Sequence, residues 1–110
     1  MYEAAVTTKS FDPAQLGRKA AEVAAVLRAL ANEHRLMILC TLAEAGEASV
    51  GALAEAVGLS QSALSQHLAR MREEGLVAFR RESQTLWYRV ADPKAAKLLD
   101  TLHRLYCRTD

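Results

Sequence analysis

The chain has 110 residues, a length typical of one domain whose modest core an oligomer interface could extend. Hydrophobic residues make up 51% of the chain and aromatic residues only 5%, which favours closely packed helices. No apolar run reaches the roughly 18 residues of a membrane span, and the N-terminus lacks the basic-then-apolar order of a secretory signal. We therefore expect a mainly helical cytoplasmic protein, without membrane contact, that forms a dimer.

The formal net charge of +1 does not by itself indicate a nucleic-acid partner, so the distribution of charge matters more than its sum. Residues 60–90 contain five Lys or Arg against three Asp or Glu, whereas residues 1–59 contain five against seven. Positive charge is therefore concentrated in the middle third of the chain, which is the first place to look for a DNA-binding surface.

The first predicted helix spans about residues 13–30. Asp12 and Pro13 form the cap and first-turn pair that commonly starts a helix. Apolar residues then recur at helical spacing, and this stripe consists of Leu16, Ala20, Val23, Val26, Leu27 and Leu30. Residues 1–11, which precede the helix, are expected to be flexible.

A second helix is predicted over about residues 33–45. It follows the cap residue Asn32 and ends at Gly46. Its periodic apolar residues are Leu36, Leu39, Cys40 and Ala43. Taken alone, this pattern makes Cys40 a small core hydrophobe.

A third, short helix begins after Ser49, ends at Gly58 and carries the apolar residues Leu53, Ala54 and Val57. Only Leu59 separates Gly58 from the next cap residue, Ser60. Two helices joined by so tight a turn indicate a helix-turn-helix at about residues 49–74.

The helix from Ser60 to Gly75 has the properties of a DNA recognition helix. Ser60 can cap its start, and Gly75 can take the left-handed conformation that ends it. A narrow apolar stripe, formed by Leu64, Leu68 and Met71, is available for packing. The remaining surface carries side chains that suit base edges and phosphates, namely Gln61, Ser62, Ser65, Gln66, His67 and Arg70.

A β-hairpin is predicted next, because residues 76–79 and 85–90 are β-prone. Its tip, residues 80–84, is polar and basic, so the segment at about 76–91 is interpreted as a wing. Trp87 and Tyr88 alternate along the second strand, and one of them is expected to pack on the core while the other stays partly exposed.

The last predicted helix runs from Pro93, after the cap residue Asp92, to about residue 108. It carries a broad apolar stripe that consists of Ala95, Leu98, Leu99, Leu102, Leu105 and Tyr106. The fold class is therefore mainly α with a small hairpin, a winged helix-turn-helix in one domain.

The chain resembles the ArsR family of bacterial winged helix-turn-helix repressors. The segments that carry the resemblance are ALANEHRLMILCTL at 29–42 and LSQSALSQHLARMREEGLV at 59–77, within a match over about 16–107. The resemblance implies a homodimer built by the helices at about 13–30 and 93–108. Its two recognition helices would enter successive major grooves of a pseudo-palindromic DNA operator.

The resemblance also implies DNA contacts. Ser62, Ser65, Gln66 and His67 would face bases or phosphates, with Gln66 preferred for base readout, and Arg70, Arg80 and Arg81 would neutralise phosphate charge. The alternative for His67 is a packing or capping role. For Arg80 and Arg81 the alternative is a solvated turn.

Sensor chemistry separates the branches of this family. Soft-metal sensors commonly place a Cys-x-Cys pair on the second helix, whereas here Cys40 is followed by Thr41 and Leu42. Zinc-type sensors place Asp-x-His and later His ligands near the last helix, whereas here Asp92-x-Lys94 precedes a lone His103. Neither metal pattern is intact, so no metal and no cofactor is expected.

The remaining pair, Cys40 and Cys107, resembles the sulfide-responsive branch of the BigR and SqrR type. This resemblance implies that reactive sulfur species, per- or polysulfides, link the two thiols within a subunit and release the DNA. Arg104 and Arg108 could stabilise the Cys107 thiolate. The alternatives left open are peroxide sensing through a simple disulfide, an incomplete metal site, no sensing, and an interaction module or small enzyme, although the scattered His residues make an enzyme the weakest of these.

Overall fold

The computed structural model describes residues 12–107, which form a small three-stranded sheet and five helices. The expected flexibility of residues 1–11 and the role given to Arg108 lie outside the described residues. Within the described part of the chain, no helix is both long enough and apolar enough to cross a membrane. The elements in chain order are α2 (Pro13–Leu30), α3 (Glu33–Ala45), β1 (Ala48–Ser49), α4 (Val50–Val57), α5 (Gln61–Glu73), β2 (Val77–Glu82), β3 (Thr85–Val90) and α6 (Pro93–Tyr106).

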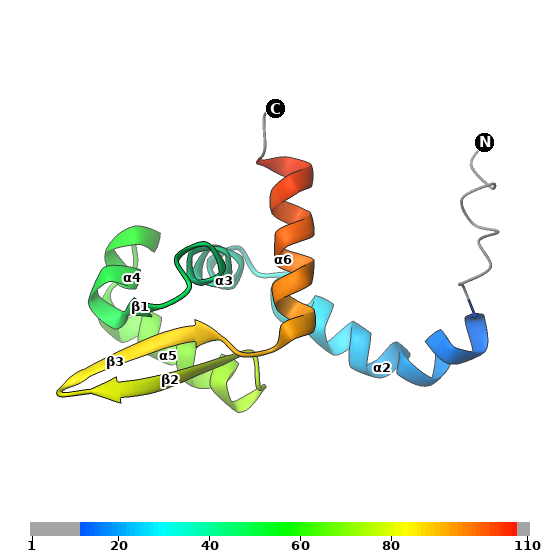
Figure 1. Cartoon of the computed structure of the whole chain (residues 1–110), viewed down its shortest axis with the longest axis horizontal. Helices are drawn as coiled ribbons and strands as arrows, with labels where there is room; N and C mark the ends of the chain where they lie inside the picture. The colour runs from blue at the N-terminus through cyan, green and yellow to red at the C-terminus, as the bar shows by residue number, and fades with distance from the viewer. Residues whose placement is uncertain (1–11, 108–110) are drawn as a thin grey trace.

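Helix α3 lies at the centre of the fold and contacts α2, α4, α6 and β3 (Figure 1). On one side, α4 and α5 form the helix-turn-helix, and the β2–β3 hairpin extends beside α5. On the other side, α2 extends away from the body of the molecule, and α6 rises between the two parts (Figure 1). The winged helix-turn-helix predicted from the sequence is therefore confirmed.

Each predicted helix start is confirmed by a capping hydrogen bond. The side-chain oxygens of Asp12, Asn32, Ser49, Ser60 and Asp92 accept backbone N–H groups two or three residues further on, at 2.9–3.2 Å. These bonds satisfy donors that have no partner within the helix. The sequence signals for helix starts were therefore correct to the residue.

Helix α5 ends in a Schellman closure. Gly75 has a φ of +79°, its N–H donates to the carbonyl of Arg72, and the Leu76 N–H donates to that of Met71. Leu76 is then buried beside the core. The left-handed conformation predicted for Gly75 is confirmed, and it turns the chain from the recognition helix into the wing.

The core stripe of α5 is as predicted, whereas that of α3 differs. Leu64, Leu68 and Met71 are all buried. In α3, however, Ile38 and Leu42 are fully buried and Ala43 is exposed. The predicted stripe on α3 was wrong in these positions because this helix is covered on several sides, so that its burial does not follow a single face.

The sheet has one strand more than predicted. The two-residue strand β1 pairs antiparallel with β3, Ala48 opposite Tyr88, and the order is β1-β3-β2. Strand β2 also continues to Glu82, so the turn consists only of Ser83 and Gln84. The prediction that placed the wing tip at 80–84 was therefore too wide. Residues 80–84 are all polar, and residues 80–82 belong to a strand end that is exposed on both faces, so the usual polar–apolar alternation of a strand is missing there.

Trp87 and Tyr88 behave as predicted, since Tyr88 is buried and Trp87 is half-exposed.

The apolar stripes of α2 and α6 are only partly covered. Along α2, Leu16, Val23 and Leu27 stay 39–51% exposed, and near the end of α6, Leu105 and Tyr106 are 69% and 81% exposed. Within one chain these two helices therefore keep an uncovered apolar surface.

Candidate DNA interface and sensor thiols

The outer face of α5 is polar, and its geometry follows from the buried stripe on the opposite face. With about 100° of rotation per residue, Ser62 and Gln66 point directly away from Leu64, Leu68 and Met71. Both side chains are exposed. Gln66 is therefore well placed to reach a base edge, because its amide both donates and accepts hydrogen bonds.

The other residues predicted on this helix lie at its flanks. Gln61, Ser65 and Arg70 are exposed. His67 is half-buried, and its ring lies 5.9 Å from that of His34 in α3, measured between centroids. Burial lowers the pKa of His67, and the nearby Arg35, His34 and Arg70 lower it further. A neutral His67 that packs against α3 fits the packing alternative raised from the sequence.

The two wing arginines point to opposite faces of the hairpin. Arg81 shares a face with Phe79, two residues earlier in the strand. The Arg72 guanidinium lies 5.1 Å from the Phe79 ring centroid, so this is the face toward α5. Arg81 is exposed there, and Arg72, which was not among the predicted DNA contacts, adds a second cation on the same side.

Arg80 lies on the other face and is engaged by two carboxylates. Its Nε and Nη2 donate to Glu47 at 2.8 and 3.0 Å, and its Nη1 donates to Glu82 at 3.1 Å. These bonds raise the pKa of Arg80 and hold that of Glu47 below its usual value. The Arg80 guanidinium also lies 5.8 Å from the Trp87 ring centroid.

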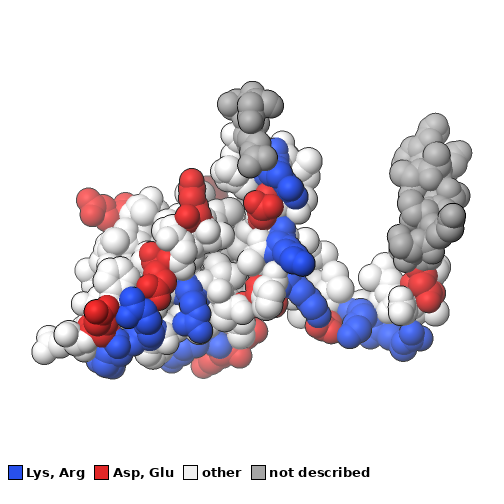
Figure 2. Space-filling view, viewed as in Figure 1, with Lys and Arg blue, Asp and Glu red and all other residues white. Residues whose placement is uncertain are grey.

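The charge of Arg80 is thus largely compensated within the protein. No sequence signal identified Glu47 as its partner, because the two residues meet only when the loop before β1 lies against the wing. Figure 2 shows the resulting mixture, with Lys and Arg side chains along the wing and the lower edge of the molecule and Asp and Glu side chains among them.

The two cysteines are free thiols on neighbouring helices. Cys40 is half-buried on α3, and Cys107 is exposed at the C-terminal cap of α6. Burial raises the pKa of Cys40, and the negative charges of the Cys107 thiolate and Glu44 raise it further. Both effects favour the neutral thiol form of Cys40.

A cleft of about 350 Å³ opens beside Cys40 between α3 and α6, and Asp100 and His103 of α6 also line it. Arg104, predicted to stabilise the Cys107 thiolate, pairs instead with Asp100 at 3.6 Å. Within residues 12–107, no three His, Cys, Asp or Glu side chains are arranged to hold a metal ion.

The chain is similar to known bacterial regulators over most of its length. The family described as "Bacterial regulatory protein, arsR family" matches residues 32–78. The transcriptional activator HlyU of Vibrio cholerae is 45% identical over 96 residues, which cover 87% of this chain and 88% of the relative. The biofilm growth-associated repressor of Agrobacterium fabrum is 46% identical over 90 residues, covering 82% and 76%.

A solved structure agrees with these sequence matches. The crystal structure of the transcriptional repressor BigR from Xylella fastidiosa superposes with a TM-score of 0.82 at 39% identity, covering 90% of this chain and all of that one. These relatives are named as transcriptional regulators and not as enzymes. The chain belongs to the ArsR family of bacterial regulatory proteins and is a DNA-binding transcriptional regulator with a winged helix-turn-helix fold.

Proposed function

We propose that the protein is a homodimeric cytoplasmic repressor that leaves its operator when reactive sulfur species link Cys40 to Cys107. The observation that carries the DNA-binding part is the exposed polar face of α5 opposite its buried stripe, with Gln66 at its centre. Ser62, Ser65 and Gln66 read or approach bases, and Arg70 and Arg81 neutralise phosphates. Since one relative is named an activator and another a repressor, repression is part of the proposal.

The uncovered apolar surfaces of α2 and α6 support the homodimer. Exposed apolar side chains that recur along one face of a helix mark an interaction surface. Leu16 and Val23 of α2 line one groove together with Leu98 of α6. A twofold dimer that covers this surface would present two recognition helices to successive major grooves.

The thiol chemistry begins at Cys107, because it is the more accessible sulfur. Its thiolate attacks an inorganic polysulfide, forms a new S–S bond and expels a shorter polysulfide, which leaves a chain of two added sulfur atoms on Cys107. The Cys40 thiolate, after losing its proton to solvent, attacks the inner added sulfur and expels hydrosulfide. The two thiols together lose two electrons to the polysulfide, and the product is a trisulfide bridge.

Cys40 lines the cleft between α3 and α6 together with His103, which lies one helical turn before Cys107, and this arrangement supports the bridge. Added sulfur also relaxes the distance limit of a direct disulfide. The raised pKa of Cys40 disfavours its thiolate, which agrees with giving the first attack to the more exposed Cys107. The bridge would strain α3 against α6 and shift the placement of the recognition helices in the dimer.

Operator binding, titrated with and without inorganic polysulfide, tests the proposal. The operator duplex is first selected from random-sequence DNA by the reduced wild-type protein. We expect the reduced protein to bind, polysulfide to weaken binding and dithiothreitol to restore it. Cys40→Ser and Cys107→Ser are expected to bind DNA normally and to lose the response.

Three results would contradict parts of this proposal. Normal responses from both cysteine variants would exclude the thiol mechanism. Release of DNA by stoichiometric zinc or copper would favour a metal inducer, and release by peroxide alone would favour a simple disulfide. Absence of any salt-dependent duplex binding would exclude a DNA-binding function and leave an interaction module.

A further inference from the structure

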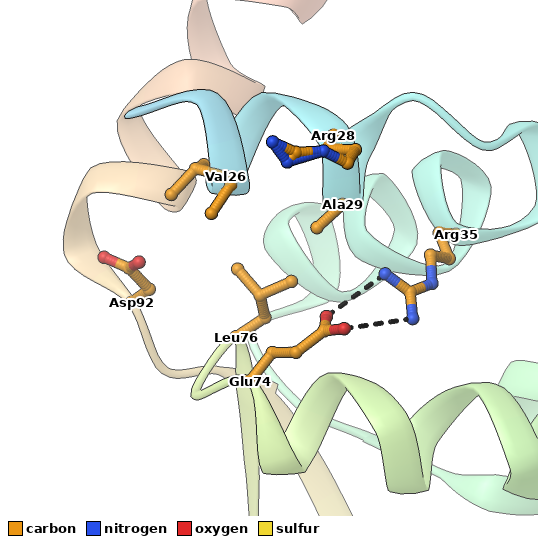
Figure 3. Close-up of a pocket in the computed structure, with 8 residues that line it drawn as sticks. Val26, Arg28, Ala29, Arg35, Glu74, Leu76 and Asp92 are labelled. Atoms are coloured by element: carbon orange, nitrogen blue, oxygen red, sulfur yellow. Dashed lines mark hydrogen bonds and ion pairs between the residues drawn. The ribbon is translucent and has the colours of Figure 1, made fainter. Parts of the chain in front are cut away.

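The first turn of α3 holds the recognition helix through a bidentate ion pair. Nη1 and Nη2 of Arg35 lie 3.1 and 3.5 Å from the two carboxylate oxygens of Glu74. Figure 3 shows the two side chains pointing toward one another, with Leu76 beside Glu74. Glu74 is the C-cap residue of α5, so this pair joins the start of α3 to the end of the recognition helix.

This ion pair differs from the exposed ones elsewhere on the surface. The Arg35 side chain is only 12% exposed and that of Glu74 is 46% exposed, whereas Lys94 and Glu22 are 72% and 55% exposed in their pair. A planar guanidinium that meets both oxygens of a carboxylate fixes orientation as well as distance. Partial burial also reduces screening by salt. The Arg35–Glu74 pair is therefore suited to fix the angle at which α5 leaves the body of the protein.

A second contact joins the same two helices about two turns further back along α5. His34, the neighbour of Arg35, lies against His67, with the two rings inclined by 58°. Two contacts at separate points along a helix restrain its rotation and its tilt, whereas a single contact would leave it free to pivot. Neither contact uses the outer face of α5 that carries Ser62 and Gln66.

We propose that Arg35 and His34 are positioning residues that set the orientation of the recognition helix, through Glu74 and His67, for specific DNA binding. The inference rests on the proposed operator-binding function. It assigns sequence specificity to a pair of contacts that do not touch DNA. An error in the tilt of α5 displaces Gln66 from its base edge, while arginines that contact phosphates tolerate the displacement.

The test is a double-mutant cycle read on two duplexes. Arg35→Ala, Glu74→Ala and the double variant are titrated against the selected operator and against a scrambled duplex of equal length. The specificity ratio is the affinity for the operator divided by the affinity for the scrambled duplex. We expect each single variant to lower this ratio about tenfold, which corresponds to about 1.4 kcal/mol. The double variant is expected to lose no more than either single one, because the first substitution already breaks the pair.

Two further variants keep the test informative. Arg35→Lys retains the charge but lacks the planar guanidinium that binds both carboxylate oxygens. A loss of specificity is therefore expected for this variant even if the alanine variants fold poorly. Arg104→Gln is the control, because it removes an exposed arginine that makes a single 3.6 Å ion pair with Asp100. This variant is expected to keep the wild-type specificity. Thermal unfolding of each variant confirms that the DNA measurements are made on folded protein.

Equal losses on both duplexes would overturn the positioning role, because they would indicate a lost phosphate contact. Wild-type specificity in folded Arg35→Ala, Glu74→Ala and Arg35→Lys would overturn it as well. If the wild-type protein itself bound no duplex, the proposed DNA-binding function would fail, and the positioning role with it. The wild-type titration therefore distinguishes a failure of the proposed function from a failure of the positioning role alone.

Discussion

At the scale of single residues, two arginines that are equivalent in the sequence have different partners in the structure. Arg80 and Arg81 are adjacent, yet Arg80 is engaged by Glu47 and Glu82 while Arg81 is exposed on the side of α5. Strand alternation predicts that two neighbours face opposite ways. It does not predict which face meets an acidic partner, because Glu47 comes from a distant loop.

Substitution of the two wing arginines is expected to have different effects. Arg81→Gln removes the proposed phosphate contact. It is therefore expected to weaken binding to every duplex and to reduce the steepness of log affinity against log salt by about 0.9. Arg80→Gln leaves that slope near the wild-type value, because its charge is already paired with Glu47. Salt titrations of both variants provide the measurement, and identical slopes for the two would contradict this division.

His67 is expected to make the stability of the protein depend on pH. Its pKa is lowered from 6.5 in the folded protein, so the unfolded chain binds the proton more readily. Stability is therefore complete above the unfolded value and falls as the pH drops below it. Thermal unfolding between about pH 7.5 and 5.5 is expected to show a steeper fall for the wild type than for His67→Asn. Parallel curves would show that His67 does not contribute.

At the scale of elements, the sequence predicted the helices well because caps and stops are local signals. The five capping side chains and the left-handed Gly75 needed no knowledge of the fold. The predictions that were wrong or incomplete concern features that depend on segments distant in the sequence. Strand β1 exists only because β3 lies beside it, and the all-round burial of α3 follows from the elements packed against it.

The candidate site follows the same division. The outward face of α5 was predictable, since Ser62 and Gln66 lie opposite a stripe that the sequence displays. The contacts of its ends were not, because Arg35 and Glu74 are 39 residues apart. Both residues lie in the segments that carry the family resemblance, but only the folded chain shows that they bind each other.

Two serines of the recognition helix are expected to separate stability from DNA binding. Ser60 accepts the Ala63 N–H at 3.1 Å, so Ser60→Ala is expected to lower the free energy of unfolding by about 1 kcal/mol. Ser62, two residues further on, is exposed, so Ser62→Ala is expected to keep that free energy and to weaken operator binding. Urea unfolding and operator titration measure the two effects. The reverse assignment would contradict the geometry.

At the scale of the whole molecule, the exposed stripes of α2 and α6 are the main feature that one chain leaves incomplete. The sequence pattern of these stripes equals that of a core stripe, because apolar periodicity does not tell burial within a chain from burial against a second chain. In the structure Leu16, Leu27 and Leu105 stay exposed, which distinguishes these stripes from those buried within the chain.

A charge placed in that surface is expected to separate the subunits. Leu16→Glu introduces a carboxylate into the apolar face of α2, whereas Ala56→Glu adds the same charge to the exposed surface of α4. Sedimentation is expected to show a monomer for Leu16→Glu and a dimer for the wild type and Ala56→Glu. A dimeric Leu16→Glu variant would place the interface elsewhere.

Helix α3 joins the proposed sensing region to the proposed DNA-binding region of the molecule. It carries Arg35, which holds the end of the recognition helix, and Cys40, which faces the cleft toward α6. A bridge from Cys40 to Cys107 would therefore act on the same helix that positions α5. Such coupling requires the bridged and reduced dimers to differ in their free energy of DNA binding.

We propose above that a bridge containing added sulfur closes between Cys40 and Cys107 and releases the DNA. The most direct test is mass spectrometry of the intact protein after polysulfide treatment, with peptide mapping, on the fraction that has left an operator column. We expect one intrasubunit link between these two cysteines that is heavier than a disulfide by at least one sulfur atom. Released protein in which both thiols remain free, or are joined by a plain disulfide, would contradict the account.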